Sequence, residues 1–396
     1  MKTLNMKLAR IPLAGSSIGA VECRMVLSAL QSGRLALGPL ARKLERRLAR
    51  YVGVRHAVAV SSGTAGLHLA VRALGLTEGD EVITTPFSFV ASSSCLLYER
   101  VRPVFVDIDP KTLNIAPTLV EAAVTPRTRA ILGVDVFGLP ADWPALRRIA
   151  RRFGLALIED SCEALGTSLG RLRCGAFGDV GVFAFYPNKQ ITTGEGGMVV
   201  TNSRGIAEAC RSMANHGRRA VGMNWFEHVR LGYNYRMDEL SAALGIAQLT
   251  RIRTLLARRR RIAAEYRRLL ADEPGITLQA DPPGAVVSWF VFVVRLAPEF
   301  SRADRDGIIK TLYSRGIECA DYFRPIHLQP VFRNRFGFRR GDFPVTEAAA
   351  DRTIALPFAP SLTRQDILRV AAELRRAIAV RKLGRFTRQP VGGSSV

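Results

Sequence analysis

The sequence is poor in the residues that build disulfide frameworks and metal centres. Its 396 residues include six cysteines and five histidines, and no two cysteines form a C-x-x-C pair. A few scattered cysteines in a long chain are unlike a disulfide scaffold or a zinc site. We therefore expect reduced thiols, no metal site and a cytoplasmic protein. The cysteines are Cys23, Cys95, Cys162, Cys174, Cys210 and Cys319.

Long hydrophobic runs are also missing. The longest apolar stretch, 285–294, includes Ser288 and is about half as long as a membrane-spanning helix requires. Residues 1–20 are partly basic but contain no continuous apolar segment typical of a signal peptide. We expect neither membrane insertion nor secretion.

Acidic residues are scarce relative to basic ones. The chain has 57 Lys+Arg against 34 Asp+Glu, which leaves a net charge of +23. This excess favours an anionic partner, and nucleic acid, an acidic membrane surface and phosphorylated small molecules all suit its sign. With 48% hydrophobic residues, the composition is that of a folded globular protein, which excludes disordered and collagen-like chains.

Short β-rich segments alternate with helical patterns along the first half of the chain. This alternation predicts an α/β fold with a mostly parallel central sheet flanked by helices. In one intervening helix Asp142 is placed to cap the N-terminus, and Pro144 suits the first turn. The expected strands are 57–61, 81–85, 103–107, 129–134, 155–159, 180–185 and 197–201.

The remaining sequence predicts a second domain. A helix that starts after Asp238 is followed by the arginine-rich stretch 251–268, which we interpret as a helical connector with a solvated basic face. A strand over 289–296 and two helices with capping-box-like starts at Ser301 and Thr363 come next. We expect a large domain over 14–250, a small α+β C-terminal domain over 251–380, and a basic flexible tail over 381–396.

One lysine has a position suited to covalent chemistry. Lys189 lies in the segment 182–197 (VFAFYPNKQITTGEGG), in a Gly- and Thr-rich loop between two expected strands. Loops at the ends of strands in an α/β sheet build ligand sites. An amine placed there suits Schiff-base formation, in which the neutral lysine is the nucleophile. The alternative is a solvated loop lysine without a function.

Two further segments are expected at the same edge of the sheet. Residues 61–66 (SSGTAG) follow a strand and open a helix, and the free N–H groups of a helix N-terminus bind anions such as a phosphate monoester. Asp160 ends another strand, where a carboxylate is placed to pair with a cationic ring nitrogen. Taken alone, the first segment also fits simple helix capping and the second a solvated carboxylate.

Together these segments resemble the DegT/StrS-type sugar aminotransferases, which depend on pyridoxal 5'-phosphate (PLP). The likeness extends over about residues 18–378. It implies a fold-type I enzyme with a large α/β domain, a small C-terminal domain, and a homodimer whose active sites lie at the subunit interface. The motifs that carry it are 61–65 (SSGTA), 85–89 (TPFSF), 159–166 (EDSCEALG), 188–189 (NK) with 192–197 (TTGEGG), and 232–237 (GYNYRM).

The resemblance assigns roles to three residues around the cofactor ring. It implies that Lys189 bonds covalently to the cofactor aldehyde and, once freed, moves a proton between the substrate and cofactor carbons. Asp160 would keep the pyridine nitrogen protonated, which maintains the ring as an electron sink. Phe89 would stack on the ring face, although core packing is the alternative for this side chain.

Five residues are implied around the phosphate. Gly63, Thr64 and Ala65 would cradle it at a helix N-terminus. Asn234 and Arg236, on a loop just before a helix, would reach across from the partner subunit toward the phosphate or the substrate.

Three positions depart from the family pattern. Ala184 stands where a serine commonly offers the phosphate a hydroxyl, and Asp135 replaces a frequent histidine. Glu163 occupies a position often held by a glutamine that donates to the phenolic oxygen of the cofactor. An ionised carboxylate only accepts hydrogen bonds. Glu163 is therefore protonated, turned away, or serving another group.

Two residues lie in segments that resemble the substrate side of relatives. Arg219 or its neighbour Arg218 is expected to pair with a nucleotide pyrophosphate, because a guanidinium makes bidentate contacts with phosphate oxygens. A solvated loop arginine is the alternative. His327 is the second candidate on this side.

The resemblance implies transfer of an amino group, with L-glutamate as the expected donor, to a nucleotide-linked keto-sugar in aminosugar, polysaccharide or antibiotic biosynthesis. A keto-cyclitol substrate and other PLP chemistry are alternatives, although dehydratase relatives carry histidine in place of Lys189. The run 258–261 (RRRR) suggests a nucleic-acid-binding regulator as a distant alternative, and a non-catalytic paralogue is a third. We expect no nucleic-acid partner.

Overall fold

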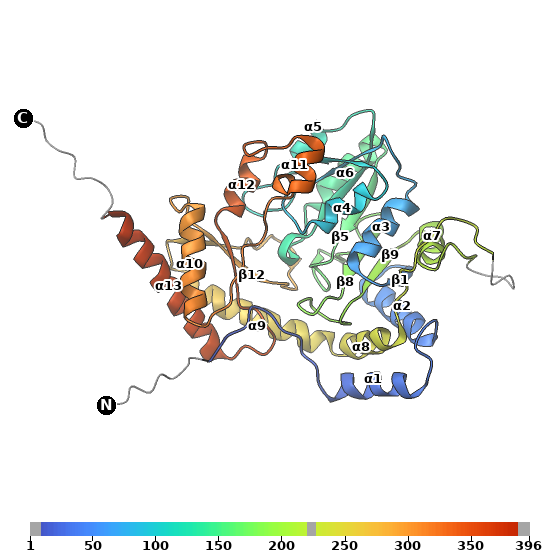
Figure 1. Ribbon diagram of the computed structural model, residues 1–396, viewed down its shortest axis with the longest axis horizontal. Coiled ribbons are helices and arrows are strands. Elements are labelled where there is room, and N and C mark those ends of the chain that lie inside the picture. Colours follow the sequence, from blue (N-terminus) through green and yellow to red (C-terminus); the bar gives the residue numbers. More distant parts are fainter. Residues whose placement is uncertain (1–8, 220–226, 387–396) are drawn as a thin grey trace, which may run out of the picture.

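A seven-stranded sheet forms the centre of the larger part of the molecule (Figure 1). The computed structural model describes residues 9–219 and 227–386. The strand order is β1-β9-β8-β5-β4-β2-β3, in which β9 is antiparallel to both neighbours and the other pairs are parallel. All seven predicted strands belong to this sheet. They are β1 His56–Val60, β2 Glu81–Thr84, β3 Arg102–Phe105, β4 Thr128–Val134, β5 Ala156–Asp160, β8 Val180–Ala184 and β9 Gly197–Thr201.

Helices cover both faces of this sheet. Val58 and Val60 of β1 belong to the same buried cluster as residues of α3 and α7, whereas Ala57 and Ala59 pack with residues of α2 and α8. Successive residues of a strand point to opposite faces, so a sheet covered on both sides needs apolar residues at nearly every position. The helices around the sheet are α1 Ala20–Gln31, α2 Pro39–Val52, α3 Gly63–Ala73, α4 Ala91–Leu97, α5 Pro117–Ala122, η1 Val136–Gly138, α6 Trp143–Phe153, α7 Arg204–Ala214 and α8 Glu239–Thr250.

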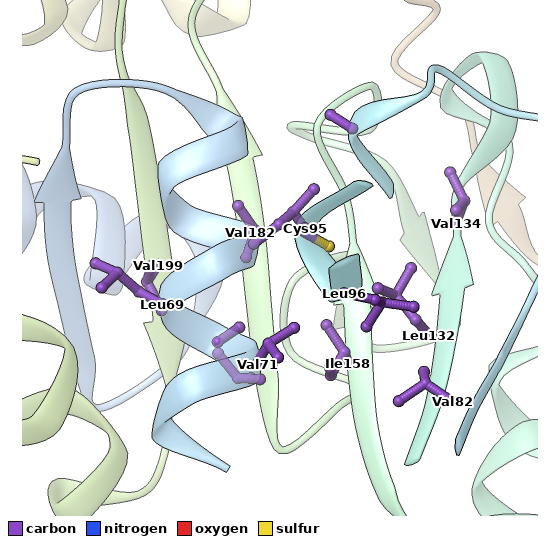
Figure 2. Close-up of a cluster of buried hydrophobic side chains, with 14 of the residues drawn as sticks. Leu69, Val71, Val82, Cys95, Leu96, Leu132, Val134, Ile158, Val182 and Val199 are labelled. Carbon is purple, nitrogen blue, oxygen red and sulfur yellow. The ribbon is translucent and has the colours of Figure 1, made fainter. Parts of the chain in front are cut away.

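The cluster under α3 and α4 is shown in Figure 2. Leu69 and Val71 of α3, together with Leu96 of α4, meet Ile158 and Val182 from neighbouring strands. This packing holds α3 and α4 against β5 and β8. The residues that follow β5 and β8 therefore lie beside the starts of α3 and α4.

The predicted helix starts are confirmed by their caps. The Asp142 carboxylate accepts the Ala145 N–H at the start of α6, and Asp238 accepts the Ser241 N–H at the start of α8. Ser301 and Asp304 form a reciprocal capping box. These side chains satisfy N–H groups that have no partner inside the helix.

A second, smaller sheet follows the long helix α9 Ile252–Leu270. Its order is β10-β12-β13, all antiparallel, and it packs against α9, α10 and α13. The strand predicted over 289–296 begins only at Phe292, because Trp289 has a φ of 55° that breaks the extended backbone. The elements here are β10 Ile276–Leu278, β12 Phe292–Leu296, α10 Arg302–Ser314, η2 Ile326–Leu328, α11 Pro330–Phe336, α12 Pro344–Ala350, β13 Thr353–Leu356 and α13 Arg364–Phe386.

A small three-stranded sheet joins the two parts of the chain. It pairs β11 Ala285–Val286 with β6 Ser168–Leu169, which pairs in turn with β7 Leu172–Arg173.

The C-terminal helix is longer than predicted. Because α13 runs to Phe386, residues 381–386 of the segment expected to be a flexible tail are helical, and 387–396 lie outside the described residues. Across the described ranges, no helix combines the length and apolar character needed to cross a membrane.

Candidate active site

A cavity of about 550 Å³ opens where β5 and β8 end, beside the N-termini of α3 and α4. The large part of the chain supplies most of its wall, and three aromatic residues of the smaller part complete it. Six residues predicted from the sequence line this cavity: Gly63, Thr64, Phe89, Asp160, Glu163 and Lys189.

Lys189 lines the cavity. Its side chain is 13% exposed, and Nζ lies 3.6 Å from Glu163 Oε1 and 3.8 Å from the centroid of the Phe290 ring. An ammonium over a ring face is held by the ring quadrupole, and a carboxylate at this distance adds Coulomb attraction. The amine is thus held in place inside the cavity rather than extended into solvent.

A buried arginine holds the loop that carries Lys189. Arg259 of α9 is 1% exposed, and its guanidinium donates to the backbone carbonyls of Asn188 (3.1 Å), Lys189 (2.9 Å) and Phe290 (2.9 Å). Burial lowers the pKa of Arg259 to about 10. The expectation of a fully solvated basic face on this helix is therefore wrong at Arg259, because the loop carbonyls replace water as its acceptors.

Asp160 is buried at the end of β5, and its carboxylate can accept further hydrogen bonds. Its Oδ2 accepts the Ser92 hydroxyl (2.7 Å), and its Oδ1 accepts the Cys162 N–H (3.1 Å). A carboxylate has about four lone-pair sites, so these two bonds leave room for a further donor. Sequence reasoning missed Ser92. Its hydroxyl lies 2.8 Å from that of Ser88, which precedes α4, and no local pattern in the sequence marked Ser92.

The N-terminus of α3 forms one end of the cavity. Ser62 caps the helix by accepting the Ala65 N–H, and Gly63 and Thr64 line the cavity. A Cβ on Gly63 would lie 2.7 Å from the Ala184 Cβ, so glycine lets the helix approach β8 closely. Ala65 is buried, and its N–H is used by Ser62. The structure therefore does not bring Ala65 to the cavity wall.

Glu163 faces Lys189 and serves a second group. Its Oε2 accepts the Phe137 N–H (2.8 Å), and Phe137 has a left-handed φ of 59° that this bond helps to hold. Burial raises the pKa of Glu163, while the positive charge of Lys189 opposes that rise. Of the three alternatives for Glu163, the structure supports the last. The carboxyl group faces the cavity and contacts the Phe137 N–H and Lys189.

The loop residues predicted to reach a partner do not line the cavity of their own chain. Asn234 is exposed, and Arg236 donates to Asn215 Oδ1 (2.9 Å) at the edge of a separate hollow. Arg219 is exposed and makes a bidentate pair with Glu227 (both 3.0 Å).

His327 is not brought to the cavity either. Its ring is fully buried, and Nε2 lies 3.0 Å from Glu347 Oε1. Burial lowers the pKa of His327, and Glu347 acts in the opposite direction. This histidine holds η2 against α12 rather than facing a ligand.

Most of the aromatic wall of the cavity was not predicted from the sequence. Phe290, Tyr322 and Phe323 come from the smaller part of the chain, and the Phe323 ring stacks on Phe137 (5.2 Å between centroids). All three lie more than 50 residues beyond the last motif of the large part, which ends at Met237, and no local pattern connects them to it.

Comparison with known proteins shows the family. The model of the DegT/DnrJ/EryC1/StrS aminotransferase family matches residues 16–375. The chain belongs to this family. It is 35% identical over 366 residues to the spore coat polysaccharide biosynthesis protein SpsC of Bacillus subtilis, covering 90% of this chain and 94% of that protein.

Solved structures of aminotransferases share the fold. DesV of S. venezuelae has a TM-score of 0.87 and 35% identity over 93% of this chain and 99% of DesV. DesI, solved in the presence of its TDP-sugar product, has a TM-score of 0.87 and 34% identity over 96% of both chains. The putative sugar aminotransferase Spr1654 from Streptococcus pneumoniae, in its PLP form, has a TM-score of 0.88 and 27% identity over 94% of this chain and 99% of Spr1654.

The residues of this aminotransferase fit PLP, the cofactor of its fold family. Gly63 and Thr64, the first two residues of α3, line the cavity, and the free N–H groups of a helix N-terminus suit a phosphate. Asp160 retains acceptor capacity for a protonated ring nitrogen. In the same wall, the buried Asn188 Oδ1 has no hydrogen-bond partner among the described residues, which leaves it available to a bound group.

Behind Asp160, the aminotransferase contains a fully buried pair of carboxyl groups. The Ser161 hydroxyl lies 2.8 Å from Asp135 Oδ2 and 3.0 Å from Glu159 Oε1. A hydroxyl has one proton, so both contacts are hydrogen bonds only if one carboxyl group is protonated. Burial raises the pKa of Asp135 to about 6. Burial, together with the charge of Asp135, raises that of Glu159 to about 8.

The same pair, with the Cys174 thiol, offers three potential metal ligands within 4.8 Å of one another. Protein donors already occupy the carboxylate oxygens. The Trp143 Nε1–H (2.8 Å) and the Ala141 N–H (3.0 Å) donate to Asp135, and the Phe177 N–H (2.8 Å) donates to Glu159. The group is therefore a hydrogen-bond network.

We predict that this pair makes stability fall as pH rises. Both acids have folded-state pKa values above their ordinary ones, so the folded protein binds more protons than the unfolded chain between about pH 4.5 and pH 8. Stability is therefore lost across that range. In Asp135→Asn, the amide keeps its oxygen for Trp143 and Ala141 and donates to Ser161, which donates to Glu159. Thermal melting should show this variant about 2 °C or more above the wild type at pH 8.

Glu78→Gln is the matched control, because Glu78 forms an exposed pair with Arg100. Its melting temperature should equal that of the wild type at pH 8. An Asp135→Asn protein that melts below the wild type at pH 8 would show that the pair does not share a proton.

Proposed function

We propose that this aminotransferase uses PLP to transfer an amino group from L-glutamate to a nucleotide-linked keto-sugar. The observation that carries the proposal is one cavity in which Lys189, Asp160 and the N-terminus of α3 face a common space. The TDP-sugar product of the similar enzyme DesI supports the substrate class. The net charge of +23 suits a substrate that carries a diphosphate.

When bound, PLP supplies an aldehyde that carries the amino group and a ring that withdraws electrons from the reacting carbon. Asp160 holds a proton at the ring nitrogen through its free lone pairs, and Ser92 fixes the orientation of that carboxylate. Thr64 and the first-turn N–H groups of α3 bind the phosphate. Phe89 covers the ring from the cavity mouth.

Lys189 has two roles in this proposal. Its amine is the group that would hold the cofactor aldehyde covalently, and in its free form Nζ would accept a proton from the donor's Cα and supply one at the cofactor carbon. The Phe290 ring and Glu163 keep the freed amine within reach of that carbon, because both contact Nζ.

A homodimer completes the site. Phe89 is 61% exposed and Tyr186 is 52% exposed, and both line the cavity. A second chain would cover these large apolar groups, which a single chain leaves open to solvent. Asn234, Arg236 and Arg219 do not line their own cavity and are proposed to act at that of the partner. His327 is not included, because it is fully buried.

The experiment loads the purified protein with PLP, adds L-glutamate, and screens keto-sugars by mass spectrometry for the amino product. Nucleotide-linked keto-sugars should be converted, and the matching free keto-sugars should not. Conversion of keto-cyclitols alone, or of free sugars equally well, would contradict the proposed substrate class.

A variant of Glu163 tests the contact with Lys189. In Glu163→Gln the negative charge 3.6 Å from Nζ is removed, so the covalent nitrogen loses its proton at lower pH. The pH midpoint of the cofactor absorbance change should fall by about 1 unit or more. Glu195→Gln is the control, since this exposed carboxylate also lines the cavity and should leave the midpoint unchanged. An equal midpoint in all three proteins would show that Glu163 does not act on this nitrogen.

A further inference from the structure

A buried histidine outside the cavity has both ring nitrogens engaged. His68 of α3 is 3% exposed, its Nε2 lies 2.7 Å from Glu99 Oε1, and its Nδ1 lies 3.2 Å from the Tyr235 hydroxyl. Arg72 donates to the other Glu99 oxygen (2.8 Å), and the Tyr233 hydroxyl donates to Oε1 (3.2 Å). Glu99 thus acts as an acceptor throughout. The tautomer that satisfies the network carries its proton on Nε2 and accepts from Tyr235 at Nδ1.

The two tyrosines of this network flank Asn234. Their rings stack on each other with centroids 4.9 Å apart, and the Tyr233 ring lies 4.8 Å from that of His68. Asn234 itself is in a β-bridge with Asn215. Alternate residues of an extended segment share one side. Tyr233 and Tyr235 are half-buried and point toward His68, so the exposed Asn234 side chain between them faces the other way. His68 and its partners thereby set the direction of Asn234.

The network also connects this loop to the cavity of its own chain. His68 follows Thr64 by about one turn of α3, and the Ser61 N–H donates to the Tyr235 carbonyl (2.8 Å) just before the same helix. Glu99 follows the end of α4, the helix that carries Ser92. The loop is therefore anchored on the two helices whose N-termini form the site.

We propose that His68 and Glu99 are positioning residues that aim Asn234 of one chain into the active site of the other. This inference rests on the homodimer of the proposed function. Neither His68 nor Glu99 lines the cavity. Loss of either side chain is therefore expected to weaken cofactor binding in the cavity of the partner chain.

Hybrid dimers separate this role from a general loss of packing. Chains with two different tags are co-expressed, and hybrids are isolated by successive affinity steps. PLP affinity is measured by borohydride labelling of the Lys189-bearing chain at a series of PLP concentrations. The His68→Leu homodimer should bind PLP about ten- to a hundredfold more weakly than the wild type, because the loop no longer presents a hydrogen bond to a charged group.

The expected result is reciprocal. A His68→Leu chain paired with a Lys189→Ala chain has its Lys189 cavity opposite an intact loop, so its PLP affinity should return to the wild-type value. A wild-type chain paired with a His68→Leu, Lys189→Ala chain should show the weak affinity. Tyr235→Phe, which keeps the ring but loses the bond to His68, should follow the same pattern with a smaller change.

Tyr98→Phe is the control, since the Tyr98 ring packs on His68 at 5.1 Å and its exposed hydroxyl has no part in the network. It should bind PLP as the wild type does. The proposal is overturned if the first hybrid stays weak, if the second is normal, or if the wild type is a monomer. Failure of the proposed substrate class would appear separately, as a wild type that binds PLP but converts no nucleotide-linked keto-sugar.

Discussion

Replacing Lys189 with alanine should lower kcat by at least about 10³-fold, since both the covalent bond to the cofactor and the proton transfer depend on one amine. Among the described residues that line the cavity, Lys189 is the only lysine or arginine. Arg259, which supports the same loop, donates to backbone carbonyls. The variant should fold, because the Lys189 side chain contributes one ion pair and one contact with Phe290. The measurement is single-turnover formation of the amino product.

Lys310→Ala is the matched control for that experiment. Lys310 lies on the exposed side of α10 and does not line the cavity, so its loss should leave kcat within about twofold. A Lys189→Ala enzyme with more than about a tenth of wild-type kcat would contradict the role of this amine.

Asp160→Asn should lower kcat by about 10²–10³-fold, the range found when one preorganised electrostatic partner is removed. The amide is neutral and cannot hold a proton at the ring nitrogen as the carboxylate does. One of the two present donors, the Ser92 hydroxyl or the Cys162 N–H, also loses its acceptor. The cofactor absorbance of the loaded variant should change together with the rate.

Asp142→Asn provides the matched control for Asp160→Asn. Asparagine caps helices as well as aspartate does, so the start of α6 should be preserved and kcat unchanged. An Asp160→Asn enzyme with normal kcat and a normal spectrum would show that the carboxylate does not face the ring nitrogen.

The sheet could be predicted from the sequence because its signals are local. Each of the seven strands is a short apolar run bounded by turn residues, and caps such as Asp142 mark helix starts. The strand over 289–296 was placed too early for a reason invisible in its composition. Trp289 adopts a left-handed backbone conformation in the folded chain, and the apolar pattern of this segment does not predict such a conformation.

The site residues that belong to sequence motifs could be predicted. The residues of the cavity wall that come from distant segments of the chain could not. Lys189, Asp160 and Gly63 all follow or precede strands of one sheet, so topology brings them together. Phe290 reaches Lys189 from the smaller part of the chain, and Arg259 supports the loop from within a run that reads as a charged surface. His327 looked suited to a ligand but is buried against Glu347, a pairing that only the folded chain reveals.

Borohydride reduction of the PLP-loaded protein, followed by peptide mapping, tests the central claim most directly. Reduction fixes the cofactor to the amine that holds it. The account predicts one labelled peptide per chain, with the label on Lys189. A label on any other amine, or no label in a protein that is fully loaded, would contradict it.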